Sequence, residues 1–367
     1  MNDNNLRLYF RFIRYALGLC PWDGADIDWR GFYRFCKAQT LLGVAFDGVQ
    51  RLPREQAPQQ QILLSWFAAH RQIAMRNRRM NEATAEIYNR VRTAGAGCCI
   101  LKGQANAMMY PNPSSRIPGD VDAWVDAPRE QIRRIAHSLA LADGRVGEEC
   151  LYHISLTVGD VDVELHFTPA VVCNPIYNRR VQKWMRRNAK VQCDNVVALP
   201  DGAGDVAVPT AEFNAVYQLL HLYHHYLYEG VGLRQIVDYY FVVSALHADG
   251  AAMQSLRREL RRLGLWHFAG AVMYVLHEVM GLEPHRMVAP VDRRRGLLLM
   301  AEILAGGNFG HHGENHGGAR TWRHNIYRLK KDLRLVAYYP AECLAEPFYR
   351  LWHFVWRWRV NAADKTF

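Results

Sequence analysis

Two short segments of the chain carry acidic side chains in alternation with apolar ones. Residues 119–125 read GDVDAWV and residues 161–167 read VDVELHF. Successive side chains of a β-strand point to opposite faces, so Asp120 and Asp122 would share one face of the first strand. The polar face of the second strand would carry Asp162, Glu164 and His166. If the two strands are neighbours, their carboxylates converge on one spot.

Converging carboxylates need compensation, because like charges at close range repel strongly in a low dielectric. Hard oxygen ligands suit Mg²⁺ or Mn²⁺. Two such ions can stabilise the attacking and leaving oxygens of a phosphoryl or nucleotidyl transfer. The two segments together therefore indicate metal-dependent transfer of a phosphorus group. The alternative is that each segment is an ordinary strand with one solvated face.

A possible phosphate-binding turn, KGQ at residues 102–104, lies upstream of the first acidic segment. It follows an apolar run at residues 98–101 and precedes a short helix expected over residues 105–110. Glycine lets the backbone approach a phosphate closely, and the start of a helix offers free N–H groups to an anion. The side chain of Lys102 would add a positive charge. The alternative is a plain turn between a strand and a helix.

The order of these segments resembles the DNA polymerase β-like nucleotidyltransferase superfamily. The fuller pattern is similar to one branch of it, the bacterial uncharacterised nucleotidyltransferase family, and extends from near Arg30 to near Arg350. The motifs that carry this resemblance are, in chain order, Leu101-Lys102-Gly103, Tyr110-Pro111, Arg116, Gly119-Asp120-Val121-Asp122, Glu164-Leu165-His166, Leu220-His221 with His225, Gly232-Leu233-Arg234-Gln235 with Asp238, and Gly307-Asn308-Phe309-Gly310.

The resemblance implies an α+β protein in which a polymerase β-like nucleotidyltransferase core, a mixed sheet with flanking helices, lies between helical N- and C-terminal regions. It implies transfer of a nucleoside monophosphate from an NTP, with ATP expected, in the presence of Mg²⁺ or Mn²⁺. Asp120 and Asp122 would bind both ions, and Glu164 would complete the catalytic metal site and help deprotonate the acceptor hydroxyl. Alternation along the strand leaves Asp162 as a rival, and the family pattern favours Glu164.

The same resemblance implies which residues hold the nucleotide. They are Lys102, Gly103, Gln104, Arg116, Gly119 and Arg234. The superfamily usually has Gly-Ser or Gly-Gly at the turn, so a serine contact to phosphate is not expected here. Arg234 and Asp238 are four apart on an expected helix. They either form an ion pair with each other or leave the planar guanidinium of Arg234 to reach the triphosphate.

Composition limits the class of protein. The chain has 367 residues, half of them hydrophobic, so it should be globular and large enough for two or three domains. We expect a helical region over residues 1–94, the nucleotidyltransferase core over 95–200 and a helical domain over 206–367. A linker is expected between Pro200 and Asp205, where proline, glycine and aspartate gather.

Charge and cysteine usage bear on partners and location. Lys plus Arg exceed Asp plus Glu by 45 − 35 = 10, which favours an anionic partner such as nucleotide, RNA or an acidic surface, or simply serves solubility. The eight cysteines form no CxxC pair and are expected to be reduced, as in a cytoplasmic protein. No apolar run reaches the length of about 18 residues that a transmembrane helix needs.

Three further features of the sequence can each be interpreted in more than one way. His221 and His225 are four apart on a helix expected over residues 212–228, and would either bind a metal or border the catalytic cleft. The stretch Gly306–Gly318 is rich in glycine and histidine, and would be a flexible loop or a lid. Tryptophans and arginines between residues 348 and 359 would bind nucleic acid or a membrane surface, or pack a terminal helix onto its own domain.

A second function remains open beside nucleotidyl transfer. The core could be a catalytically degenerate module that binds nucleotide or RNA on its basic surface. The complete set of acids argues against it, because converging carboxylates would repel phosphate unless a metal were bound. The sequence leaves the acceptor open among a protein, an RNA end and a small molecule.

Overall fold

The computed structural model describes residues 3–141, 144–246, 250–306, 331 and 333–363, and the expected motif at 307–310 lies outside these ranges, as does all of the glycine- and histidine-rich stretch after Gly306. Within the described ranges the α+β architecture is confirmed: a five-stranded mixed sheet is flanked and covered by helices. None of the helices in these ranges has both the length and the apolar character needed to cross a membrane.

The central sheet brings the two acidic segments together. Its strand order is β1-β2-β5-β4-β3, with β2 and β5 parallel and every other neighbouring pair antiparallel. The strands are β1 (Gly97–Leu101), β2 (Val121–Asp126), β3 (Gly144–Glu149), β4 (His153–Val158) and β5 (Val161–His166). Asp122 on β2 lies directly opposite Glu164 on β5. The predicted tight hairpin at Gly159-Asp160 is confirmed as the connection between β4 and β5.

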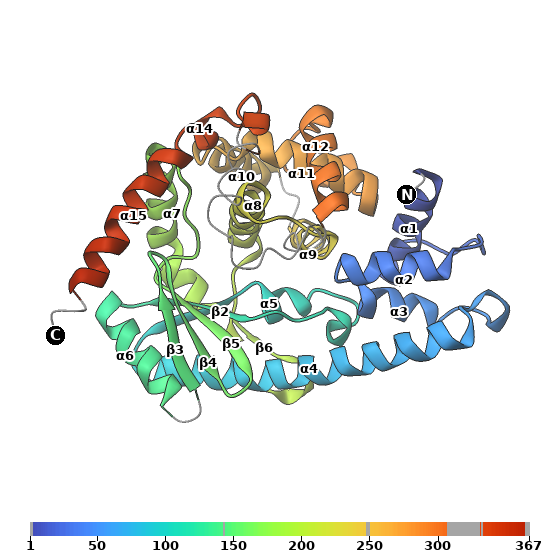
Figure 1. The fold of residues 1–367 in the computed structure, drawn as a ribbon, viewed down its shortest axis with the longest axis horizontal. Coiled ribbons are helices and arrows are strands. Elements are labelled where there is room, and N and C mark those ends of the chain that lie inside the picture. The colour runs from blue at the N-terminus through green and yellow to red at the C-terminus, as the bar shows by residue number, and fades with distance from the viewer. Residues whose placement is uncertain (1–2, 142–143, 247–249, 307–330, 332, 364–367) are drawn as a thin grey trace.

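Alternation along the strands separates an apolar face from a functional one. Val121, Val163 and Leu165 belong to a hydrophobic cluster formed with α4 (Gln60–Thr93) and α6 (Arg129–Ala140). Trp124 points the other way and stacks on Phe213, with ring centroids 5.7 Å apart. Because Asp122 is two residues from Trp124, it shares that second face. The acids therefore share the face of the sheet that packs against Phe213, and helices of the C-terminal half of the chain lie over that face (Figure 1).

Those C-terminal helices form the other layer of the molecule. They are α7 (Pro175–Asp194), α8 (Ala211–Tyr228), α9 (Leu233–Ser244), α10 (Gly250–Arg262), α11 (Trp266–Met280), α12 (Arg293–Gly306), α14 (Pro340–Cys343) and α15 (Glu346–Ala363). The segment expected to be a linker is instead the turn of a small hairpin between β6 (Val196–Ala198) and β7 (Asp205–Ala207), so its proline and glycines mark a turn within the fold.

The N-terminal helices connect the two layers. They are α1 (Asp3–Ala16), α2 (Trp29–Ala38), α3 (Leu42–Val49) and α4, which continues beneath the sheet (Figure 1). Trp66 on α4 is fully buried and donates a hydrogen bond to the carbonyl of Leu42 at 2.8 Å. Gln39 links this region to α9 and α12, because it accepts from the backbone of Leu233 and donates to the carbonyl of Ile303. One hydrophobic cluster runs through both helical regions.

The cysteines and the last helix complete the comparison with the sequence. None of the eight cysteines is part of a disulfide, as expected. Two aromatic side chains of the last helix are not packed onto its own domain, because Phe348 is 76% exposed and Phe354 69% exposed on α15, whereas Tyr349 packs against the main hydrophobic cluster. That interpretation of the tryptophan- and arginine-rich stretch is wrong for these two side chains.

Candidate active site

Three carboxylates converge at the junction of β2 and β5. One oxygen from each of Asp120, Asp122 and Glu164 lies within 4.8 Å of the others. The carboxylate of Asp122 is almost completely buried, and its charge, followed by burial, raises the pKa of Asp120 to about 6. That shift means that the negative charge of the group is not fully compensated by the protein. Three hard oxygen donors with uncompensated charge fit Mg²⁺ or Mn²⁺.

Asp162 is separated from this group, although it shares the strand face of Glu164 by alternation. Its side chain is exposed, while Glu164 is half-buried and lines the cavity. The register explains the difference, because Glu164 is level with Asp122 and Asp162 lies two residues nearer the hairpin turn. A shift of two residues along a strand is about 6.6 Å, which is long compared with a metal–carboxylate bond.

Lys102 occupies a strained backbone position between β1 and α5 (Gly103–Ala107). Its φ is 49°, a value that residues with a side chain rarely adopt. The Nζ atom lies 2.8 Å from Oδ1 of Asp122. Burial alone would lower the pKa of Lys102, but the acidic groups around it, Asp122 first among them, together raise it, so the ammonium stays charged. A Cβ added to Gly103 would meet the carbonyl oxygen of Asp120 at 3.2 Å, so this turn packs closely against the start of β2.

His166 is a second buried cation beside the acids, and the sequence placed it on the polar face and in a family motif without assigning it a role. Its Nε2 lies 2.9 Å from Oδ1 of Asp122 and 3.3 Å from Oε2 of Glu164. Burial alone would lower the pKa of His166, but hydrogen bonds to both carboxylates raise it to about 9. His153 lies opposite His166 on β4, with Nδ1 3.4 Å from the same oxygen of Glu164. Only the strand pairing could reveal this second histidine.

Arg116 and Asp238 form a buried, bidentate ion pair. Nε and Nη2 of Arg116 donate to the two carboxylate oxygens, each at 2.8 Å, and the hydroxyl of Tyr110 donates to Oδ1 at 2.7 Å. Burial alone would raise the pKa of Asp238, but Arg116 outweighs it and lowers it. The predicted ion pair between Arg234 and Asp238 is therefore wrong, because Asp238 pairs with Arg116 instead. Arg116 ties the loop before β2 to α9.

Arg234 lines the same cavity without a carboxylate of its own. Its Nη1 donates to the carbonyl of Ile117 at 2.9 Å, its Nε makes no hydrogen bond, and the residue is 7% exposed. Within the described ranges it forms no ion pair. Burial, and then the neighbouring charge of Arg116, lower the pKa of Arg234 to about 10. Such a buried guanidinium has unused capacity for an anion.

Every predicted site residue except one lines a single cavity. The members are Asp120, Asp122, Glu164, Lys102, Gly103, Arg116, Gly119 and Arg234. The exception is Gln104, whose side chain turns away and donates to Oδ1 of Asn81 on α4. The expectation that this side chain faces the phosphates does not agree with its position, because α5 directs it toward α4.

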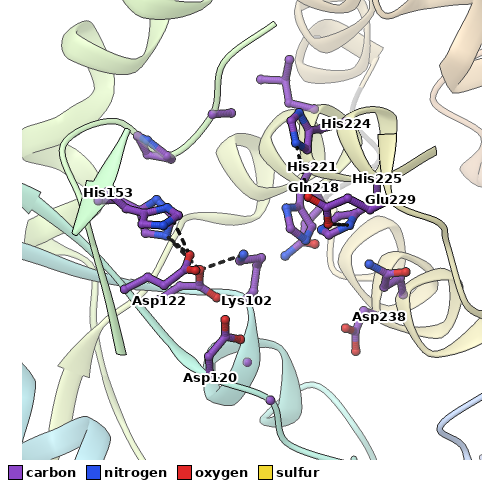
Figure 2. A pocket seen from close by; sticks show the side chains of 18 of the residues that line it. Lys102, Asp120, Asp122, His153, Gln218, His221, His224, His225, Glu229 and Asp238 are labelled. Atoms are coloured by element: carbon purple, nitrogen blue, oxygen red, sulfur yellow. Dashed lines mark hydrogen bonds and ion pairs between the residues drawn. The ribbon is translucent and has the colours of Figure 1, made fainter. Parts of the chain in front are cut away.

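The opposite wall of the cavity is formed by α8 and the turn that follows it. Gln218, His221, His224, His225 and Glu229 line it, facing the acids and Lys102 across the cavity (Figure 2). Nδ1 of His225 lies 2.7 Å from Oε2 of Glu229. Within the described ranges, neither of the two groups with metal-binding geometry includes an α8 histidine. The structure thus supports the interpretation that His221 and His225 border the cleft.

Comparisons with known proteins found a matching family and a similar solved structure. Residues 25–281 match the family described as "Uncharacterised nucleotidyltransferase". No curated protein matches the chain. Among solved structures, an antigenic nucleotidyltransferase-like protein from Paracoccidioides brasiliensis is similar at 14% identity and a TM-score of 0.36, covering 58% of this chain and 94% of that one.

The Arg116–Asp238 pair gives a prediction about stability. Asp238→Asn should lower the free energy of unfolding by about 3–5 kcal/mol, because it leaves a buried guanidinium without its counter-charge. Urea denaturation measures this difference. Glu149→Gln is the matched control, since Glu149 pairs with Arg129 and Arg133 at the surface and should cost at most about 1 kcal/mol. Equal losses in the two variants would contradict a structural role for the buried pair.

Proposed function

The chain belongs to the uncharacterised nucleotidyltransferase family, and on that premise we propose that it transfers a nucleoside monophosphate from an NTP, expected to be ATP, to an acceptor hydroxyl. The observation that carries the proposal is the convergence of Asp120, Asp122 and Glu164 within 4.8 Å. A cavity shared by these acids and by buried cations can accommodate both a metal and a triphosphate. The free cysteines are consistent with the proposed cytoplasmic location.

In this proposal the acids act as metal ligands. Asp120 and Asp122 would hold two ions, and Glu164 would complete the site nearer the acceptor. Mg²⁺ or Mn²⁺ bound there would stabilise the charge on the attacking and leaving oxygens. The acceptor oxygen would form a bond to the α-phosphorus, and the bond from that phosphorus to the bridging oxygen of the β-phosphate would break. Pyrophosphate would leave, while Glu164 would help to take up the hydroxyl proton.

The cations of the cavity are proposed to hold the phosphates. Lys102 lies beside the acids, and Arg234 has an unpaired Nε in the same cavity. A planar guanidinium suits a phosphate group because it donates two parallel hydrogen bonds. Gly103 and Gly119 line the cavity without a side chain, so a phosphate could approach the backbone closely at these two positions. Arg116 would act indirectly, since Asp238 already occupies its guanidinium and the pair positions the neighbouring loop.

The α8 wall is the proposed side of approach for the acceptor. It carries imidazoles and the carboxylate of Glu229, which would favour a neutral or cationic polar group over another phosphate. A protein side chain, an RNA end and a small molecule remain candidates for this acceptor. Their common requirement is a hydroxyl that can reach Glu164.

The rival proposal, a degenerate module that only binds nucleotide or RNA, makes a different prediction about metal. If the acids hold Mg²⁺, ATP should raise the melting temperature strongly with Mg²⁺ and little without it. A degenerate module would bind ATP equally well in the two conditions, because its basic groups alone would make the contacts. A thermal-shift measurement with ATP, in Mg²⁺ and in EDTA, separates the two.

The first prediction for catalysis concerns the acids that start β2. Asp120→Asn should abolish nucleotidyl transfer with the fold intact, because it removes a charge that the metal needs at nearly constant volume. Asp122→Asn should also abolish transfer, with some loss of stability, since Asp122 is paired with Lys102 and His166. Mass analysis of the acceptor measures transfer, and circular dichroism checks the fold. Turnover at the wild-type rate by either folded variant would rule out the metal-dependent mechanism.

A second prediction concerns Lys102. Lys102→Ala should raise KM for the NTP more than it lowers kcat, because a point charge on phosphate acts in the ground state as well as in the transition state. Lys183→Ala, at an exposed position of α7, is the control for the loss of one positive charge. Steady-state kinetics with varied NTP distinguishes the outcomes. An unchanged KM with a collapsed kcat would make Lys102 a transition-state group instead.

A third prediction concerns the choice between the two acids of β5. Glu164→Gln should lower kcat at least about 10²-fold, the lower end of what a positioned acid–base group contributes. Asp162→Asn should cost far less, since its side chain is exposed beyond the cavity. The two substituted residues are two positions apart on the same face of β5, so each variant serves as the control for the other. A large loss at Asp162 with a mild loss at Glu164 would refute the assignment.

A further inference from the structure

Two histidines and one carboxylate form a compact group beside the three acids. His153 and His166 lie opposite each other on β4 and β5, and Glu164 is two residues before His166 on the same strand face. Nδ1 of His153 is 3.4 Å from Oε2 of Glu164, and Nε2 of His166 is 3.3 Å from that oxygen. The three donor atoms lie within 4.8 Å of one another, and all three side chains line the cavity.

We propose that His153, Glu164 and His166 form a second metal site, which takes a divalent transition-metal ion such as Zn²⁺ and which Mg²⁺ does not fill. The site shares Glu164 with the carboxylate group of Asp120 and Asp122, and His166 would release its Nε2 proton when the ion binds, so that the ion replaces the proton beside the carboxylates. The cavity would thus hold one position with oxygen ligands only and one with mixed nitrogen and oxygen ligands. The proposal concerns metal binding alone and does not depend on nucleotidyl transfer.

The distances within the group match a coordination polyhedron. Zinc binds imidazole nitrogen and carboxylate oxygen at about 2.0–2.2 Å in a tetrahedral arrangement, which places neighbouring ligand atoms about 3.3–3.5 Å apart. The two distances to Oε2 of Glu164, 3.4 and 3.3 Å, fall at this value. The third distance, between the ligand atoms of the two histidines, is at most 4.8 Å.

The donor types select the ion. Imidazole nitrogen suits zinc, iron, nickel and copper, whereas Mg²⁺ prefers oxygen ligands and gives up its waters reluctantly. Three protein ligands on one side leave further positions open, as in catalytic rather than structural zinc sites. Because the group faces the cavity, an ion there could act as a Lewis acid on an oxygen of the acceptor.

The other account of these histidines is purely positional. His166 could serve only to hold Asp122 and Glu164 by hydrogen bonds, with His153 packed edge-on against it at a ring-centroid distance of 5.3 Å. In that account, transition-metal binding would not depend on His153. The two accounts therefore differ in a quantity that can be measured without nucleotide or acceptor.

The test uses the full chain stripped of metal and titrated calorimetrically with Zn²⁺ and, separately, with Mg²⁺. The wild type should bind one Zn²⁺ tightly, and His153→Gln should weaken that site by at least about 10- to 100-fold, the loss seen even for residues that only support a metal ligand. His224→Ala is the matched control, because His224 lines the same cavity from α8 and lies outside the group. Co²⁺ in place of Zn²⁺ should give a visible absorption band that changes in His153→Gln.

Either of two results would overturn the proposal. One is tight Zn²⁺ binding that His153→Gln leaves unchanged, which would place the ion elsewhere, and the other is the absence of a tight Zn²⁺ site in the wild type. His166→Gln provides a second variant, with circular dichroism to check its fold. If it does not fold, His153→Gln decides alone, since the side chain of His153 is 15% exposed against 5% for that of His166.

Discussion

The burial of the Asp122 carboxylate is the constraint on which the rest of the site depends. This side chain is almost completely removed from water, and an isolated ionised carboxylate in such a place would be costly. Lys102 and His166 compensate it from two sides, at 2.8 and 2.9 Å. Burial alone would raise the pKa of Asp122, and the two cations instead lower it, so the carboxylate stays ionised. The strained turn at Lys102 follows from this requirement, because it aims the ammonium at β2.

The same principle organises the next layer outward. Asp120 and Glu164 bring the group to three carboxylates against two cations, so this part of the cavity keeps a net negative charge that a divalent ion would compensate. Farther along the cavity, both carboxylate oxygens of Asp238 accept hydrogen bonds from Arg116, and the Nε of Arg234 has no hydrogen-bond partner. In the proposed function, the end of the cavity at the sheet would bind the metal and the end at α9 would bind the phosphates. The α8 wall, with its histidines and Glu229, closes the side between them (Figure 2).

Local patterns in the sequence predicted much of this arrangement. The remaining features depend on how the strands pair, which only the structure shows. Alternation placed Asp120 with Asp122 and placed Glu164 with His166, and the hairpin at Gly159-Asp160 was evident from its turn residues. Alternation could not distinguish Glu164 from Asp162, since both share one face; the family pattern favoured Glu164, and the parallel register of β2 and β5 places it level with Asp122. His153 could not be found because its relevance comes from a cross-strand pairing.

Errors had the same physical origin. Arg234 and Asp238 are well spaced for an ion pair on one helix, but Arg116 reaches Asp238 from a distant loop with better geometry. The side chain of Gln104 follows a glycine turn that suggested phosphate binding, yet the direction of α5 sends it to Asn81. A proline and two glycines after Leu199 suggested a linker where a short hairpin turns. In each case a tertiary contact outweighed a local rule.

The most direct measurement is to follow which phosphorus atom of the nucleotide moves. The chain is incubated with Mg²⁺ and an NTP labelled either at the α- or at the γ-phosphate, together with separate pools of small molecules, RNA and protein. The account predicts that only the α-label becomes attached to an acceptor and that pyrophosphate is released in equal amount. Transfer of the γ-label, or no transfer of the α-label to any pool, would contradict it.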